Sequence, residues 1–239
     1  MIPRPPFFEV GVKNYLYGDN VLALALAADE AAKRCDIDVL FIAPYMELRR
    51  VAERTDRLIV LAPYMDTLRP GPGMTDVLPE AVAAAGAKGV VINHCERPMS
   101  LSAIRRTMLR ANELGLFTFV CADTIAEAKA VAELGPDILN PELTERIGAG
   151  QGSDPGYVRA SIQAVKSVNP KILVEQAAGI TSGQQVYELL MAGAEGVGAA
   201  SGVCAAPDPC AALWDMVLHA QKARDALRAR RLRMEGEGA

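Results

Sequence analysis

Eight short runs rich in β-branched and aromatic residues alternate with longer Ala- and Leu-rich segments along the chain. The runs that we expect to form strands are 7–13, 38–43, 58–63, 89–94, 117–122, 137–142, 171–176 and 196–201. Most segments between them carry apolar residues at helical spacing, and several close on a glycine. This alternation is typical of an α/β protein whose parallel strands are joined by right-handed crossovers. Eight units predict a single (β/α)₈ barrel, with an open doubly wound sheet as the alternative.

The chain is expected to form one domain over residues 1–239, because half of its residues are apolar and can fill one large core. A charged segment at about 228–239 is expected to be a solvated, frayed tail. The net charge of −4 and the few aromatic residues provide no basic stripe or stacking surface. We therefore expect no nucleic-acid partner and instead a small anionic metabolite.

The other composition features point to a cytoplasmic protein without a metal. No apolar run is long enough for a signal peptide or a membrane span, so we expect no membrane association. The five cysteines have neither disulfide-framework nor zinc-finger spacing, which predicts reduced thiols. The only two histidines, His94 and His219, lie far apart in the sequence, so no metal site is expected.

Three polar residues finish predicted strands that are otherwise apolar: Lys13, His94 and Glu142. Each one alone is more often a rim or surface group. In barrels of this kind, however, the C-terminal ends of the strands meet around the active site. Together the three residues form a cation, an electrophile and a base, which is the set needed to abstract a proton next to a carbonyl. The sequence therefore predicts a proton-transfer site.

Three glycine-rich segments follow late strands. Residues 177–183 (AAGITSG) and 200–203 (ASGV) follow the seventh and eighth strands, where such barrels hold phosphate with backbone N–H groups. Residues 142–156 begin at Glu142 and form a loop long enough to be a functional lid. Tight turns and a plain surface connection are the alternatives for these segments.

Several motifs in this order resemble the triosephosphate isomerase family, and most closely its shorter archaeal-type branch. They are VINHCER (91–97), ELTERIGAG (142–150), AAGITSG (177–183) and GVGAASGV (196–203). The resemblance covers nearly the whole chain and implies a TIM barrel and an aldose–ketose isomerase without a cofactor. It also implies a phosphorylated sugar as substrate and a homodimer or homotetramer, in which the segment around Thr75 reaches a neighbouring subunit.

The resemblance also implies residue roles. Glu142 would be the catalytic base, His94 a neutral electrophile and Lys13 the cation that stabilises the enediolate. Glu96 would support the lysine, with Arg97 as its structural partner. The implied phosphate ligands are Gly148, Thr181, Ser182, Ser201 and Gly202, and Cys121 corresponds to a buried structural cysteine.

The chain departs from the family pattern where substrate is recognised. Gly11 stands where the family usually has asparagine, and Pro63 where it commonly has glutamine. Asp76 and Ala177 replace family glycines in the intersubunit and phosphate segments. We expect these changes to keep the reaction type and to affect the choice of substrate. Triosephosphate isomerase activity is the first prediction, and an isomerase of a larger sugar such as erythrulose phosphate is the second. An epimerase or synthase, or a non-catalytic phosphometabolite-binding barrel, are the remaining alternatives.

Overall fold

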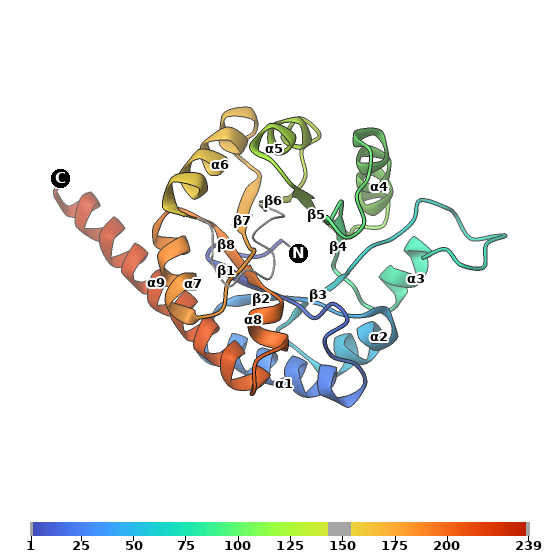
Figure 1. Cartoon of the computed structure of the whole chain (residues 1–239), viewed down its shortest axis with the longest axis horizontal. Helices are drawn as coiled ribbons and strands as arrows, with labels where there is room; N and C mark the ends of the chain where they lie inside the picture. The colour runs from blue at the N-terminus through green and yellow to red at the C-terminus, as the bar shows by residue number, and fades with distance from the viewer. Residues whose placement is uncertain (1, 143–153, 238–239) are drawn as a thin grey trace.

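The computed structural model describes residues 2–142 and 154–237, and these form a closed barrel of eight parallel strands in the order β1 to β8 (Figure 1). The strands are β1 (Phe7–Gly11), β2 (Asp38–Ile42), β3 (Ile59–Ala62), β4 (Gly89–Ile92), β5 (Phe117–Ala122), β6 (Ile138–Pro141), β7 (Leu173–Gln176) and β8 (Gly196–Ala199). The barrel closes because β1 pairs with both β2 and β8. The predicted (β/α)₈ barrel is confirmed, and the alternative of an open sheet is wrong.

The helices surround the barrel (Figure 1). They are α1 (Asp19–Cys35), α2 (Tyr45–Arg54), α3 (Pro79–Ala84), α4 (Leu101–Glu113), α5 (Ile125–Ala132), α6 (Pro155–Val168), α7 (Gly183–Met191), α8 (Ser201–Cys204) and α9 (Pro209–Glu237). Polar side chains begin several of them: Ser100, Thr124 and Ser182 each accept a hydrogen bond from the backbone N–H three residues later. Within the described ranges, none of the helices is both long and apolar enough to cross a membrane.

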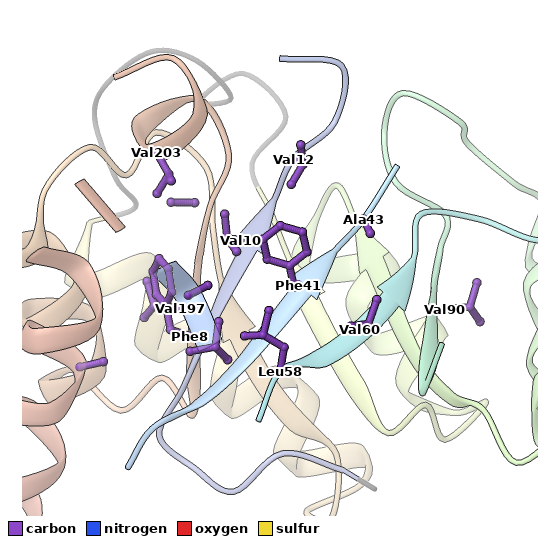
Figure 2. Packing of buried hydrophobic residues seen from close by; sticks show 14 of the residues in the cluster. Phe8, Val10, Val12, Phe41, Ala43, Leu58, Val60, Val90, Val197 and Val203 are labelled. Carbon is purple, nitrogen blue, oxygen red and sulfur yellow. The ribbon is translucent and has the colours of Figure 1, made fainter. Parts of the chain in front are cut away.

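Strand alternation separates the apolar side chains into two layers. Phe8, Val10 and Val197 point outward and pack under the helices, as Figure 2 shows together with other members of this outer layer. Phe7 and Phe117 point inward and belong to a smaller cluster inside the barrel. This alternation places the residues that share the inner face of one strand one above another along the barrel axis.

Glycines on the inner face make room for the large side chains. A Cβ on Gly196 would lie 2.2 Å from the Phe7 ring, and a Cβ on Gly89 would lie 2.8 Å from the Phe117 ring. Both aromatic rings therefore fill the lower part of the barrel, and the polar residues further along the same strands are left to form its upper part.

Two expectations about segment ends need comment. The strands β1, β4 and β6 end one or two residues before Lys13, His94 and Glu142, so these residues open the following loops. The segment after residue 228 continues helix α9 as far as Glu237, where we expected a frayed tail. Its run of Ala, Leu and Arg residues favours helix, and the side chains of Leu232 and Met234 are exposed. The predicted lid, residues 142–156, lies outside the described residues except for its two ends.

Candidate active site

A pocket opens at the C-terminal ends of the strands, and the predicted trio lines it. Its lining comprises Lys13, Ile42, Val91, His94, Phe119, Cys121, Asn140, Glu142, Ala177 to Ile180 and Gly198 to Ser201. The structure therefore brings together Lys13, His94, Glu142 and Ser201 from four different strand ends. This is the face of a (β/α)₈ barrel on which catalytic sites form.

Lys13 is held in an uncommon backbone conformation. Its φ of +49° lies in the left-handed region, which a non-glycine residue adopts only where the surroundings enforce it. Its Nζ donates to Oε1 of Glu96 at 3.1 Å. Burial by itself lowers the pKa of Lys13, but the hydrogen bond to Glu96 and the charges of Glu96 and Glu142 outweigh it and raise the pKa. The raised pKa favours the protonated, cationic form of Lys13 in the pocket at neutral pH.

His94 is positioned by the turn that follows β4. The backbone N–H of Glu96 donates to its Nδ1 at 3.2 Å, so in the neutral imidazole the proton is on Nε2. Burial and the charge of Lys13 lower the pKa of His94. The carboxylate of Glu96 lies 3.7 Å from Nδ1, but an ion pair there would require a protonated ring. We favour the neutral ring, because Nδ1 already accepts a backbone hydrogen bond and the pKa is lowered.

The turn itself is fixed by Asn93, which has a φ of +60°. Its side-chain amide donates to the carbonyl oxygen of Cys121 at 2.9 Å, and its Oδ1 accepts from the backbone N–H of Met99 at 2.7 Å. These bonds tie the loop after β4 to strand β5. They hold His94 so that Nε2–H, which has no acceptor among the described residues, can serve as a donor.

Glu142 extends strand β6 by one residue, since its backbone N–H donates to the carbonyl oxygen of Ala122 at 2.9 Å. The residue is only 8% exposed. Burial raises its pKa to about 7, an effect that Lys13 opposes and that the charges of Asp123 and Glu96 assist. A carboxyl with a pKa near neutrality is well matched to the role of a general base.

The loops after β7 and β8 approach each other closely at Gly202. A Cβ at this position would lie 2.0 Å from the carbonyl oxygen of Ile180, so only glycine permits the contact. Ser201 and Gly202 open α8, and the first N–H groups of a helix have no acceptor within it. Backbone donors beside the pocket are suited to an anion.

The predicted phosphate ligands Thr181 and Ser182 are already hydrogen-bonded within the protein. Their N–H groups donate to Oε1 of Gln185 at 2.8 and 3.2 Å, and Ser182 caps α7. Neither residue lines the pocket, which instead reaches Ala178 and Gly179, both with positive φ. To bind a phosphate, the N–H groups of Thr181 and Ser182 would have to exchange Gln185 for the ligand.

The remaining predicted residues are placed as follows. Gly148 lies outside the described residues. Arg97 stacks on the ring of Tyr64 at 3.8 Å, and Cys121 is buried at 2% exposure and lines the pocket. Thr75 lies in the exposed segment between β3 and α3. In the part of the chain that the structure describes, no group of three or more His, Cys, Asp or Glu residues is arranged to hold a metal ion.

Sequence reasoning missed three buried polar residues on the inner face of the barrel: Glu9, Asn140 and Glu175. The signal was present, because each is a polar residue on the inner face of a strand whose other inward side chains are apolar. What the sequence did not reveal is that the two glutamates, which are far apart in the chain, lie beside the same glycine, Gly198.

Comparisons with known proteins agree with this geometry. A family profile described as triosephosphate isomerase matches residues 10–216. A protein named triosephosphate isomerase from Methanoculleus marisnigri is 39% identical over 218 residues, which cover 89% of this chain and 97% of that protein. Proteins of the same name from Methanopyrus kandleri and Methanobacterium bryantii are 37% and 34% identical, over 91% and 90% of this chain and 98% and 97% of theirs.

Proposed function

Because this chain belongs to the triosephosphate isomerase family, we propose that it interconverts glyceraldehyde 3-phosphate and dihydroxyacetone phosphate as an aldose–ketose isomerase. The observation that carries the proposal is one pocket that joins a buried carboxyl, Glu142, to a neutral His94 and a cationic Lys13. The reaction belongs to glycolysis and gluconeogenesis, so we expect the protein to act in the cytoplasm.

In the proposed mechanism, Glu142 removes the proton from the carbon next to the carbonyl group. The electrons move to the carbonyl oxygen, where Nε2–H of His94 and the ammonium of Lys13 stabilise the developing negative charge of the enediolate. Protonation of the neighbouring carbon by Glu142, with transfer of a proton between the two oxygens through His94, completes the isomerisation. No atom is gained or lost, and Glu142 ends the cycle ionised.

Glu96 acts as a positioning residue in this scheme. Its carboxylate accepts from Lys13, and its backbone N–H donates to Nδ1 of His94. One residue thus fixes the lysine and the tautomer of the histidine together. We assign the phosphate to the gap between the loops after β7 and β8, where Ser201 and Gly202 present backbone N–H groups and Gly148, Thr181 and Ser182 are additional proposed ligands.

The direct test compares the wild-type protein with Glu142→Gln in an assay of triose phosphate interconversion. Loss of the base is expected to lower kcat by about 10³-fold, within the usual range for general base catalysis. Glu133→Gln, an exposed carboxylate just after α5, is the matched control and is expected to keep full activity. A wild-type protein inactive on the trioses, or a Glu142→Gln variant with normal kcat, contradicts the proposal.

We also propose a homodimer or homotetramer. The segment between β3 and α3, which contains Thr75, extends away from the barrel (Figure 1). It carries Met74 at 98% exposure, and Met46 at the start of α2 is 91% exposed. Large apolar side chains in such positions are better accommodated in an interface than in water. Light scattering of the wild type and of Met74→Asp tests the assembly, and a monomeric wild type contradicts it.

A further inference from the structure

Two carboxyl groups that the mechanism does not use lie inside the barrel, next to the floor of the pocket. Glu9 of β1 is 6% exposed and Glu175 of β7 is fully buried. Both strands flank β8, and a Cβ on Gly198 of β8 would lie 2.2 Å from Oε2 of Glu9 and 2.2 Å from Oε1 of Glu175. The two oxygens are therefore separated by no more than twice that distance. Glycine at 198 is what permits the two carboxyl groups to meet.

The described part of the protein provides few hydrogen bonds to these carboxyl groups. Oε1 of Glu9 and both carboxyl oxygens of Glu175 have no hydrogen-bond partner among the described residues. Two adjacent carboxylates cut off from water cannot both be ionised, because burial and mutual repulsion each oppose the second charge. Protonation of both carboxyl groups removes this penalty and leaves the pair without charge.

The electrostatic surroundings favour the same state. Burial, followed by the charge of Glu142, raises the pKa of Glu9 to about 8, while Lys13 acts in the opposite direction. Burial, followed by the charge of Glu9, raises the pKa of Glu175 well above its ordinary value. The other titratable groups that face the pair are the thiols of Cys121 and Cys204, whose own pKa values are raised by burial, so both are neutral at pH 7.

Glu9 also occupies the place of a missing side chain. Oε1 of Glu9 lies 3.1 Å from the position that a Cβ would take on Gly11, the next inward residue of β1. The family usually has asparagine at position 11, so a polar group of Glu9 stands where that side chain would begin. Asn140 adds a second polar group, because it lines the pocket, is 3% exposed and has no partner for its Oδ1 among the described residues.

We propose that Glu9 and Glu175 form a protonated carboxyl pair just below the residues that line the pocket, and that Glu9 orients the substrate in place of the absent side chain at position 11. The inference rests on the proposed isomerase function. A protonated carboxyl group can donate to a carbonyl oxygen and accept from a hydroxyl. The ligand chemistry that it fits is the pair of adjacent oxygens of a hydroxy-ketone or hydroxy-aldehyde, with Oδ1 of Asn140 as a further acceptor for a hydroxyl.

The test removes the orienting group and then supplies it from position 11. Glu9→Ala is expected to lower kcat/KM by about 10- to 100-fold, the range for one hydrogen bond to a charged partner, mostly through kcat. Glu9→Gln keeps the shape and a hydrogen-bond donor, so it is expected to stay within about threefold of wild type at pH 7. The double variant Glu9→Ala, Gly11→Asn restores one hydrogen bond from position 11. Its kcat/KM is therefore expected to recover at least a tenth of what Glu9→Ala loses relative to wild type.

A pH profile separates orientation from a structural role. As the pH rises through about 8, Glu9 loses its proton and the first negative charge of the pair appears beside the enediolate, so kcat/KM of the wild type should fall. Glu9→Gln cannot ionise and should lose this alkaline limb. Unfolding temperatures check that the variants fold, and we expect no loss of stability in Glu9→Gln because an amide of the same shape replaces a buried carboxyl group that is neutral at pH 7.

The outcomes distinguish the inference from the function on which it rests. If the wild type is active and Glu9→Ala is equally active, or if the double variant is no better than Glu9→Ala, the orienting role is wrong and the isomerase function stands. Infrared spectroscopy tests the protonated pair without any substrate. A protonated-carboxyl band at pH 7 that loses intensity in both Glu9→Gln and Glu175→Gln supports the pair, and a band that either variant leaves unchanged refutes it. A wild type that shows the band but no activity refutes the proposed function alone.

Discussion

A single methyl group at position 202 should disable the anion end of the pocket. In Gly202→Ala the new Cβ would lie 2.0 Å from the carbonyl oxygen of Ile180, whereas carbon–oxygen contacts normally begin at about 3.3 Å. The loops after β7 and β8 must therefore separate by roughly 1 Å, because backbone lies on both sides of the contact. A displacement of that size costs about 100-fold in kcat/KM where a site depends on exact positioning, which is ~2.7 kcal/mol of transition-state binding.

The assay is triose phosphate interconversion measured over a range of substrate concentrations, together with binding of inorganic phosphate as a competitive inhibitor. Both the KM and the phosphate inhibition constant should rise in Gly202→Ala. Gly115→Ala is the control, since Gly115 lies between α4 and β5 with a φ of +69° and open space around it. That change is expected to cost about 1 kcal/mol of stability through backbone strain and to leave KM unchanged. A Gly202→Ala protein with wild-type KM and phosphate affinity would refute the assigned anion site.

Three further predictions concern Lys13, Glu142 and Asp29. Lys13→Met removes the cation from the pocket and is expected to lower kcat by at least about 100-fold while the unfolding temperature falls little, as measured by kinetics and thermal melts. Because Glu142 must be ionised to act as base and its pKa is raised to about 7, kcat/KM should fall about tenfold per pH unit below pH 7. A profile of kcat/KM that stays flat down to pH 5 contradicts the assignment of Glu142 as the base. Asp29→Ala leaves three backbone N–H donors of residues 56–58 without the carboxylate oxygen that they share, and should cost about 2–4 kcal/mol of unfolding free energy in urea. Burial raises the pKa of Asp29, but Lys33 and the backbone donors outweigh it and lower the pKa. The stabilisation by Asp29 is therefore present above the ordinary pKa of 3.8 and is lost as the pH falls through the lower pKa of the folded state. The difference in unfolding free energy between wild type and variant should shrink in acid.

Much of the fold was predictable because eight repeats of one local pattern leave few topologies open. Each strand was found from its own residues, and closure followed from the count of units. The ends of the strands were less predictable. Lys13 and Asn93 have left-handed backbones. Lysine gives no sign of such a conformation in the sequence, and asparagine, although it adopts it more often than most residues, does not do so at most positions. Tertiary contacts impose it: the hydrogen bonds of Asn93 to Cys121 and Met99 belong to another strand and to a later part of the same loop.

The identities of Lys13, His94 and Glu142 followed from the sequence, but their protonation states did not. The neutral tautomer of His94 depends on a backbone N–H two residues further on, and the raised pKa of Glu142 depends on its burial. Both are properties of the folded loop. The same limit applies to Thr181 and Ser182, which were predicted to be phosphate ligands and whose N–H groups donate to Gln185 in the structure. The glycine-rich sequence around them indicated backbone N–H groups that could bind an anion, whereas the hydrogen bonds that cap α7 determine where these N–H groups point.

The position of Glu9 illustrates what one strand alone cannot reveal. In the sequence, glycine at position 11 is a simple loss of a recognition group, and glutamate at position 9 is an isolated charge in an apolar strand. Alternation places both residues on the inner face of β1. Only closure of the barrel brings β7 and the side-chain-free Gly198 against that face, so that Glu9 gains a second carboxyl group and space to reach toward Gly11. If the proposed role of Glu9 holds, the residues at positions 9 and 11 are coupled, and Gly11→Asn alone should harm activity more than the double change Glu9→Ala, Gly11→Asn.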